Sequence, residues 1–286
     1  ALSRHGAAMP QRADDENEDA LKSDVAISTL FDVRGKVVVI SGGGSGLGAM
    51  MATAFVRNGA TVYIFSRKDT SHFAAELTAA GPGTCTAMVA DAQRPATVEQ
   101  LVRRIEAKEG KVHVLINNAG TNFSAPFPEY PPDAFAKVMD VNLGAVFRAI
   151  QLFLPLLRAA ATRSSPARVI NISSINGLAP PPLPTYAYSS SKAALHMLSR
   201  HLALGLAPSV TVNSIAPGPF RSRMMRATLK GAGEDAIAAG TLMRRIGAPT
   251  DIAGAALFLA SEAGAWVTGI TLSLDGGSLL SPTSSL

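Results

Sequence analysis

The sequence predicts an α/β protein whose single domain is built on one doubly wound, seven-stranded parallel sheet flanked by helices. Short apolar runs rich in Val and Ile alternate along the chain with longer segments of helical periodicity. No Pro/Gly/Ser-rich linker and no internal repeat interrupts this alternation. Because strands that are buried on both faces have continuous apolar sequences, we expect helices to cover both faces of the sheet.

The first strand is the apolar run at 36–41, which lies between Gly35 and Gly42. A segment of helical spacing follows and ends at Asn58–Gly59, a typical helix C-terminus. The other six strands are expected at 61–65, 84–90, 112–118, 167–173, 209–216 and 270–275. The other helices are expected near 70–80, 95–109, 133–161, 186–206 and 250–261. Right-handed crossovers between parallel strands then give one domain over residues 31–286.

The composition favours a well-buried core, since 47% of the 286 residues are hydrophobic and only 16% are charged. Cys85 is the single cysteine, which excludes a disulfide framework and a Cys-rich metal site. His196 and His201 share the 186–206 helix without an evident third ligand, so we expect surface or interface roles and no metal. No run of 18 uncharged apolar residues occurs, so no membrane span is expected.

The charge is unevenly distributed. Residues 1–30 hold three basic and six acidic side chains and lack apolar periodicity, which predicts a disordered or variable N-terminal tail. The residues before Met9 are either an expression remnant or the end of a processed leader. The first twelve residues have some character of a mitochondrial presequence, but the acidic run after them favours a cytoplasmic protein.

Residues 31–286 carry a net charge of +8, because the whole chain carries +5. This positive charge suits an anionic ligand, such as a phosphorylated cofactor or an acidic carrier. Nucleic acid is not expected, because no stripe of Lys and Arg is interleaved with aromatic residues.

The glycine-rich stretch "SGGGSGLG" (41–48) joins the first predicted strand to the first predicted helix. Gly42, Gly46 and Gly48 allow a tight turn and a close approach of the backbone to a pyrophosphate, at a helix N-terminus that favours anions. The strand–turn–helix context favours a Rossmann-type dinucleotide site over a ligand-free turn.

The end of the second strand indicates which dinucleotide binds. An NAD site usually has an acidic residue there, whereas this chain has Ser66, Arg67 and Lys68. A hydroxyl and two cations suit a 2′-phosphate, so NADP(H) is favoured over NAD. In the alternative interpretation, Arg67 and Lys68 belong to a solvated loop and pair with Asp69.

The stretch "YAYSSSK" (186–192) contains a candidate catalytic pair. Tyr188 and Lys192 are four residues apart and share one helix face, whereas Tyr186 and Lys192 face different ways. An ammonium group beside a tyrosine lowers the pKa of its hydroxyl. An isolated Tyr–Lys pair of this spacing is more often an exposed pair at the start of a helix than a catalytic pair. The other motifs of the chain therefore distinguish these two interpretations.

These motifs together resemble the short-chain dehydrogenase/reductase family over residues 33–278. The resemblance is carried by "GGGSGLG", "NNAG" (117–120), "VNL" (141–143), "NISS" (171–174), "YSSSK" (188–192), "APG" (216–218) and "LDGG" (274–277). Within that family the chain is similar to NADPH-dependent β-ketoacyl (acyl-carrier-protein) reductases of the rhamnolipid-pathway type. The stretches "YAYSSSKAALHMLSRHLA" and "APGPFRSRM" carry this nearer likeness.

The resemblance implies a role for each of four catalytic residues. Tyr188 would donate a proton to the carbonyl oxygen during reduction, and Lys192 would lower its pKa and bind the nicotinamide ribose. Ser174 would orient and polarise the carbonyl, and Asn142 would hold a water on the proton path. Donors placed where negative charge develops on oxygen stabilise the transition state most.

The expected cofactor contacts combine the glycine-rich loop, the cationic loop and positions implied by the resemblance. They are Ser41, Gly42, Gly44, Ser45, Gly46, Leu47, Ser66, Arg67, Lys68, Asp91, Ala92, Asn118, Ala119, Gly120, Tyr188, Lys192, Pro217, Gly218, Phe220 and Ser222. Two of these positions depart from the usual pattern of the family, because Ser41 and Ser222 stand where threonine is common.

The expected function is NADP(H)-dependent reduction of a β-ketoacyl or polyketide-like ketone to a secondary alcohol, with the substrate free or bound to a carrier or CoA. The alternatives are a dehydrogenase of a sugar, polyol or secondary metabolite and a non-catalytic dinucleotide sensor. The resemblance also implies a homo-oligomer, either a tetramer or a dimer. An apolar substrate wall is expected from the stretch 178–183 and from Phe220, Met224 and Met225, with Arg221, Arg223 and Arg226 interleaved.

Overall fold

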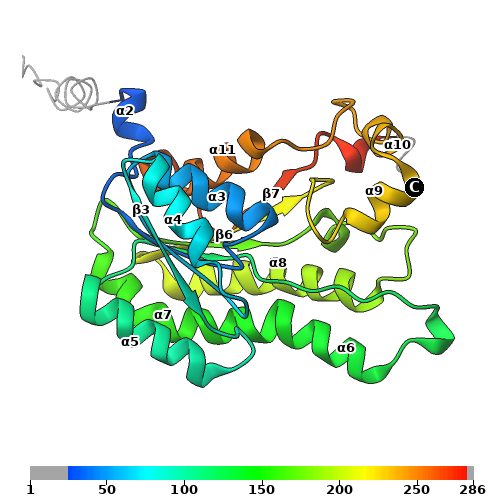
Figure 1. Ribbon diagram of the computed structural model, residues 1–286, viewed down its shortest axis with the longest axis horizontal. Helices are drawn as coiled ribbons and strands as arrows, with labels where there is room; N and C mark the ends of the chain where they lie inside the picture. The colour runs from blue at the N-terminus through cyan, green and yellow to red at the C-terminus, as the bar shows by residue number, and fades with distance from the viewer. Residues whose placement is uncertain (1–24, 282–286) are drawn as a thin grey trace, which may run out of the picture.

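A computed structural model of the chain describes residues 25–281 (Figure 1). Seven parallel strands form one sheet in the order β3-β2-β1-β4-β5-β6-β7. The strands are β1 (Val37–Ser41), β2 (Thr61–Ser66), β3 (Thr84–Val89), β4 (Val114–Asn117), β5 (Ala167–Ile172), β6 (Val210–Pro217) and β7 (Thr271–Leu274). The predicted doubly wound, seven-stranded sheet is therefore confirmed, and the strand order reverses between β1 and β4.

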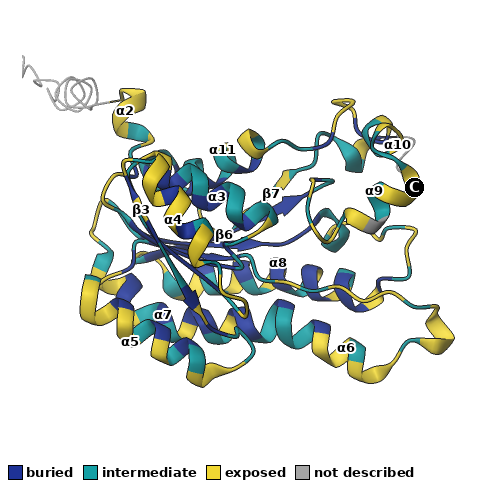
Figure 2. Cartoon of the chain, in the orientation of Figure 1, coloured by how far each residue is buried: buried dark blue, intermediate teal, exposed yellow. Residues whose placement is uncertain are grey.

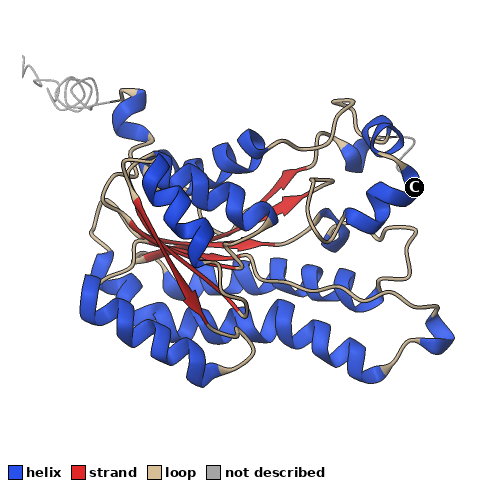
Figure 3. Ribbon diagram, viewed as in Figure 1, coloured by secondary structure: helices blue, strands red, loops and turns tan. Residues whose placement is uncertain are grey.

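Helices cover both faces of this sheet, with α3, α4 and α11 above it and α5, α7 and α8 below it in Figure 3. Their bounds are α3 (Gly46–Arg57), α4 (Ser71–Ala80), α5 (Pro95–Glu109), α6 (Pro132–Met139), α7 (Ala145–Ala160), α8 (Tyr186–Leu206) and α11 (Pro249–Ala260). Three short helices were not predicted, namely α2 (Ile27–Leu30), α9 (Arg226–Ala232) and α10 (Glu234–Ala239). The prediction of a disordered tail otherwise concerns residues 1–24, which lie outside the described residues.

The alternation of side chains along each strand builds two cores, one on each face of the sheet. In β1, Val38 and Ile40 pack with Phe55 of α3, whereas Val37 and Val39 pack on the other face. All five β1 residues are buried, and Figure 2 shows the sheet as the dark interior of the molecule. Burial on both faces explains why these strands have continuous apolar sequences.

The predicted long helix at 133–161 is interrupted by one wider turn. Residues Asp140–Gly144 form a π-helical turn between α6 and α7, and this turn contains the buried Asn142. The whole segment, Pro132–Ala160, is long and apolar enough by composition to cross a membrane. Its apolar residues, including Phe153 and Leu157, instead pack in the core beneath the sheet, which is the usual position of such a helix in a globular domain.

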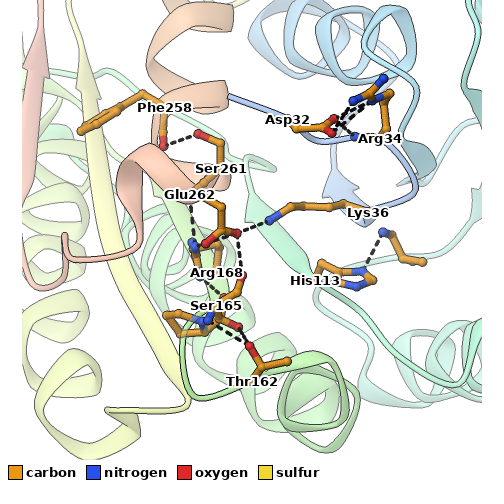
Figure 4. A network of polar contacts seen from close by, with 12 residues as sticks. Asp32, Arg34, Lys36, His113, Thr162, Ser165, Arg168, Phe258, Ser261 and Glu262 are labelled. Carbon is orange, nitrogen blue, oxygen red and sulfur yellow. Dashed lines mark hydrogen bonds and ion pairs between the residues drawn. The ribbon is translucent and has the colours of Figure 1, made fainter. Parts of the chain in front are cut away.

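At the amino-terminal edge of the sheet, buried and half-buried charges pair with one another (Figure 4). Glu262 accepts hydrogen bonds from Lys36 (3.1 Å) and Ser165 (2.6 Å), and it lies 3.8 Å from the guanidinium of Arg168. Arg168, which is 1% exposed, also donates to the carbonyl of Ser261 (3.1 Å). His113 accepts a hydrogen bond from the amide of Val37 through Nδ1 (2.9 Å), which gives it a structural role.

Candidate active site

The carboxyl ends of β1 and β4 are joined at the point where the strand order reverses. The hydroxyl of Ser41 accepts hydrogen bonds from the amides of Asn118 (2.9 Å) and Ala119 (3.0 Å). The side-chain amide of Asn118 donates back to the carbonyls of Ser41 (3.0 Å) and Gly42 (3.2 Å). Serine performs this bracing without the threonine methyl, because the hydroxyl makes both bonds. This crevice is where dinucleotides bind in doubly wound sheets.

The glycine-rich loop has no room for side chains at its critical positions. Gly42 and Gly46 have positive φ angles of 65° and 53°, a region that favours glycine. A Cβ atom at Gly48 would lie 2.3 Å from the carbonyl oxygen of Gly42. The loop therefore holds its backbone close to the start of α3, where Ser45 makes no side-chain capping bond to the free N–H groups. These features fit a bound pyrophosphate.

The cations after β2 are free to meet a phosphate. Arg67 and Lys68 are exposed, and within residues 25–281 neither forms an ion pair. Asp69 does not pair with them, because its carboxylate accepts from the amide (2.9 Å) and hydroxyl (2.5 Å) of Ser71. The hydroxyl of Ser66 donates to the carbonyl of Lys68 (2.7 Å) and holds the turn. The pairing with Asp69 in the alternative interpretation is therefore absent, although both cations are exposed to solvent as that interpretation also expects.

The remaining predicted cofactor residues surround the same crevice at the ends of other strands. Ser222 lies against the glycine-rich loop, since a Cβ atom at Gly46 would be 3.4 Å from its Cβ. Gly218 donates its amide to the carbonyl of Leu274 (3.0 Å) just after β6. Asp91 follows β3 and accepts from the amide of Gln93 (3.0 Å).

Phe220 does not behave as expected for a wall of the open site. Its side chain is 3% exposed and belongs to the core on the α3 side of the sheet. A Cβ atom at Gly247 would lie 2.4 Å from this ring, so glycine there allows the ring to fit. Arg221, from the same segment, pairs with Glu234 (2.8 Å). The predicted apolar lid is therefore corrected at Phe220, whose ring is a core residue.

Helix α8 brings the predicted catalytic side chains together. Tyr188 and Lys192 share its buried face, and the ammonium of Lys192 lies 5.7 Å from the centre of the Tyr188 ring. Ser174, just after β5, hydrogen bonds to the Tyr188 hydroxyl and accepts from the amide of Asn176 (3.1 Å). Tyr186 points away from this face and is 41% exposed. Tyr188 and Tyr186 therefore lie on different sides of α8, as their spacings from Lys192 predict.

Burial determines the protonation of this pair. It raises the pKa of Tyr188 above its ordinary value, and the hydrogen bond with Ser174 opposes this rise. It also lowers the pKa of Lys192 to about 8. The net shift of Tyr188 is opposite to the lowering expected from the neighbouring ammonium, because the desolvation of the phenolate is the larger effect. Tyr188 is therefore held as a phenol, the form that can donate a proton.

Asn142 is fixed at the wide turn between α6 and α7. Its side chain accepts from the amide of Thr121 (2.8 Å) and donates to the carbonyl of Thr121 (2.9 Å) and to the hydroxyl of Ser191 (3.0 Å). A Cβ atom at Gly120 would lie 3.4 Å from Asn142 Oδ1 and 3.7 Å from Lys192 Nζ. Asn142 thus lies beside the lysine, and π-helical turns are common at functional sites.

A buried histidine beside the site was not predicted as such. His196 is 6% exposed and hydrogen bonds through Nε2 to Ser173, whose hydroxyl also donates to the carbonyl of Lys192 (3.2 Å). Burial lowers the pKa of His196 to about 4, so the ring is neutral. The expected surface or interface role is therefore wrong for His196. Its spacing of four residues from Lys192 places it on the same buried face, a signal present in the sequence.

Sequence reasoning also missed a cavity of about 400 Å³ beside α8, which is lined by aromatic side chains. Its lining residues are Phe127, Tyr130, Pro132, Phe135 and Tyr186. Among the described residues, no group of three or more His, Cys, Asp or Glu side chains could hold a metal ion.

Comparisons with known proteins agree with this site. A family model described as Enoyl-(Acyl carrier protein) reductase matches residues 42–278. The rhamnolipids biosynthesis 3-oxoacyl-(acyl-carrier-protein) reductase of Pseudomonas aeruginosa is 39% identical over 249 residues, which cover 86% of this chain and 97% of that protein. The 3beta-hydroxysteroid dehydrogenase 1 of Eggerthella lenta is 36% identical over 263 residues, which cover 88% and 96%.

The solved structure of the Pseudomonas aeruginosa RhlG/NADP active-site complex has a TM-score of 0.83 and 39% identity, and the match covers 87% of this chain and 98% of that one. The fold and the site define a dinucleotide-linked oxidoreductase. The chain belongs to the short-chain dehydrogenase/reductase family. The predicted family and enzyme class are confirmed, and the predicted cofactor agrees with the NADP complex of this structural neighbour.

Proposed function

We propose that the protein is an NADP(H)-dependent ketoreductase that reduces a 3-oxoacyl or similar apolar ketone to a secondary alcohol. The observation that carries this proposal is the buried Tyr188 phenol, hydrogen bonded to Ser174 and stacked near Lys192. Tyr188 is in its protonated form, from which a proton can be delivered to the carbonyl oxygen, and its hydroxyl lies beside Ser174. The relative named as a 3-oxoacyl-(acyl-carrier-protein) reductase supports the substrate class.

Bound NADPH would supply the hydride. The glycine-rich loop and the N-terminus of α3 would hold its pyrophosphate, and Arg67 with Lys68 would pair with its 2′-phosphate. The fit is supported by the cradle that a Cβ atom at Gly48 would fill and by the absence of an acidic partner for these two cations among residues 25–281.

The chain's own residues would handle the proton and the oxygen. Ser174 and Tyr188 would donate to the carbonyl oxygen, where negative charge develops in the transition state. Tyr188 would then transfer its proton to that oxygen. Lys192, fixed by its hydrogen bond to the carbonyl of Ile172 (2.9 Å), would stabilise the resulting phenolate. Asn142 would complete the path by which Lys192 regains a proton.

Three further properties form part of this proposal. The ketone would be presented as a thioester of a carrier protein or CoA. The protein would act as a homodimer or homotetramer in the cytoplasm. The mitochondrial alternative rests on residues 1–12, which lie outside the described residues.

The test is NADPH oxidation, followed at 340 nm, with acetoacetyl thioester and longer 3-oxoacyl thioesters, together with a panel of sugars and polyols assayed in both directions. The expected result is turnover of the thioesters with NADPH preferred to NADH. Preferred turnover of a sugar or polyol would assign the alternative dehydrogenase class. Tight NADPH binding without turnover of any carbonyl compound would favour the non-catalytic sensor and overturn the proposal.

A further inference from the structure

The aromatic cavity beside α8 is not used by the proposed chemistry, although it lies next to the catalytic tyrosine. Tyr130 packs against the buried cluster formed by Val138, Ala187 and Tyr188. Tyr186, which lines the cavity, is only two residues from Tyr188 at the start of α8. Tyr130 therefore links the cavity to the proton donor, whereas Tyr186 faces away from the catalytic side of α8.

The cavity is built by edge-to-face contacts between aromatic rings. Tyr186 meets Phe127 and Tyr130 at 5.5 Å and 5.6 Å between ring centres, and Tyr130 meets Phe135 at 6.4 Å. Four rings and one proline line it, and no charged side chain does. The cavity is open to solvent, since Phe127 is 74% exposed, and its volume of about 400 Å³ can take an apolar chain laid along the rings.

The segment that carries these rings is anchored at the catalytic site. It begins at Thr121, whose amide and carbonyl bond to Asn142. Further along, the amide of Ala125 donates to the carbonyl of Pro184 (3.3 Å), which joins the segment to the proline-rich loop after Ser174. The hydroxyl of Tyr130 donates to the carbonyl of Phe123 (3.2 Å) and fixes the loop internally. The cavity is thus held in a fixed relation to Ser174 and Tyr188.

The charged side chains around the site indicate which end of a substrate would bind in the cavity. Glu129 and Asp133, which neighbour its lining residues in sequence, are exposed and acidic, and the exposed Lys137 offsets only one of these two charges, so the surroundings disfavour an anionic group there. Arg223 and Arg226 are exposed on the segment that leads into α9, without an ion pair among residues 25–281. In Figure 1, α9 lies above α8 and α6 lies below it.

We infer that the aromatic cavity binds the apolar acyl chain of the substrate and sets the preference for chain length. The anionic carrier or CoA end then lies on the α9 side. This inference rests on the proposed function and deepens it. Phe127 and Tyr186 are specificity-determining residues, because their rings form the cavity without touching the reacting oxygen.

The test compares kcat/KM for acetoacetyl and 3-oxodecanoyl thioesters in the wild type and in Phe127→Ala and Tyr186→Ala. Each variant should lose at least about tenfold with the decanoyl substrate, the scale on which a pocket senses one or a few methylene groups. Activity with the acetoacetyl substrate should stay within about twofold of the wild type, which also shows that the variants fold. The matched control is Phe31→Ala, because Phe31 is 41% exposed, as Tyr186 is, and directly follows α2, which lies far from α6 in Figure 1.

Three outcomes would contradict the inference. Equal losses with both substrates would indicate a structural role, and unchanged decanoyl activity would mean that the chain binds elsewhere. A wild type that reduces acetoacetyl thioester without preferring longer chains would also overturn it while leaving the proposed function intact. If the wild type reduces no 3-oxoacyl thioester at all, the proposed function itself fails.

Discussion

Lys192 and Arg168 are both buried cations: Arg168 belongs to β5 near its start, and Lys192 contacts the other end of that strand. Arg168, at the start of the strand, lies 3.8 Å from Glu262 and donates to backbone carbonyls. Lys192 donates to the carbonyl of Ile172 at the end of the strand (2.9 Å), and no carboxylate among residues 25–281 pairs with it. One buried charge is therefore compensated and the other is not.

This difference between Arg168 and Lys192 distinguishes the two edges of the sheet. The amino-terminal edge is stabilised by paired charges, whereas the carboxyl-terminal edge holds the candidate active site. Burial disfavours the charge of Arg168, and the negative charge of Glu262 opposes that effect. Burial lowers the pKa of Lys192 to about 8 without an opposing carboxylate. An uncompensated buried charge weakens the fold, and such groups cluster where chemistry needs them. The destabilising buried charge of Lys192 therefore lies at the edge of the sheet that forms the cofactor crevice.

Replacing Lys192 with methionine should have the largest effect on turnover, because it changes the carboxyl-terminal edge of the sheet where the candidate active site lies. We expect turnover to fall by about a thousandfold, because the phenolate of Tyr188 loses its neighbouring cation. The free energy of unfolding should stay the same or rise, since an apolar residue often replaces a buried charge without loss. Steady-state kinetics and urea unfolding check the two parts. A variant that is both active and less stable would reverse the assigned roles.

Replacing Arg67 with alanine should weaken NADPH binding more than NADH binding. Loss of a charge-assisted contact to the 2′-phosphate should cost on the order of 1.5–3 kcal/mol, which is roughly ten- to a hundredfold in affinity. Titration calorimetry with both cofactors measures the difference. Arg103→Ala is the matched control, because Arg103 is an exposed arginine of α5 that pairs with Glu99 (3.4 Å), and its loss should not change the preference. Equal effects of Arg67→Ala on both cofactors would show that Arg67 does not contact the 2′-phosphate.

Replacing Glu262 with glutamine should lower the stability of the amino-terminal edge of the sheet, where Glu262 pairs with Arg168. The variant leaves Arg168 buried without its anion, so we expect a loss of about 2 kcal/mol in the free energy of unfolding, less than for a fully buried pair because Glu262 is partly exposed. Turnover of the folded variant should be unchanged. Urea unfolding at pH 7 measures the loss, and a large fall in kcat with unchanged stability would contradict the separation of the two edges.

A smaller effect is expected in the pH dependence of the free energy of unfolding, which reports the uncompensated charge of Lys192. The folded pKa of Lys192 is about 8, whereas an unfolded lysine has a pKa near 10.4. Between these values the unfolded chain binds the extra proton, so stability should rise with pH. From pH 8 to pH 9.5 the wild type should gain about 1.5 kcal/mol relative to Lys192→Met, both without cofactor. Parallel curves for the two proteins would mean that Lys192 keeps its ordinary pKa.

Glu262 should act in the opposite pH range. Although burial alone would raise its pKa, the hydrogen bonds from Ser165 and Lys36 and the charges of Lys36 and Arg168 hold it below the ordinary value. The stabilisation it provides is present above the pKa of an unfolded glutamate and is lost as the pH falls through the folded pKa. The wild type should therefore lose more stability on acidification than Glu262→Gln does, as measured by urea unfolding between pH 6 and pH 3.

Local sequence patterns predicted the elements and the shared helix face of Tyr188 and Lys192 because those features depend on short spacings, whereas Ser174 and Asn142 were proposed from the family resemblance. Continuous Val and Ile runs specify strands buried on both faces, and the four-residue step from Tyr188 to Lys192 specifies a shared helix face. The same four-residue step continues to His196, so this spacing also indicates that His196 is buried. The π-helical turn around Asn142 has no such local signature, since it inserts a residue into an otherwise regular helix.

Features that depend on distant contacts were not predictable in the same way. The aromatic cavity requires the 127–135 segment to meet Tyr186, which is about fifty residues away in the chain. The burial of Phe220 depends on Gly247, whose missing side chain leaves room for the ring. The raised pKa of Tyr188 reflects desolvation by the whole fold, whereas the sequence shows only the neighbouring lysine.

The most direct test of the account is a comparison of Tyr188→Phe with Tyr186→Phe. NADPH oxidation with an acetoacetyl thioester and NADPH dissociation constants are measured for both variants and for the wild type. Tyr188→Phe should lower turnover by at least about a hundredfold with NADPH affinity little changed, because the ring remains and the proton donor is lost. Tyr186→Phe should retain most of the activity. Comparable losses in the two variants would contradict the assignment of Tyr188 as the proton donor.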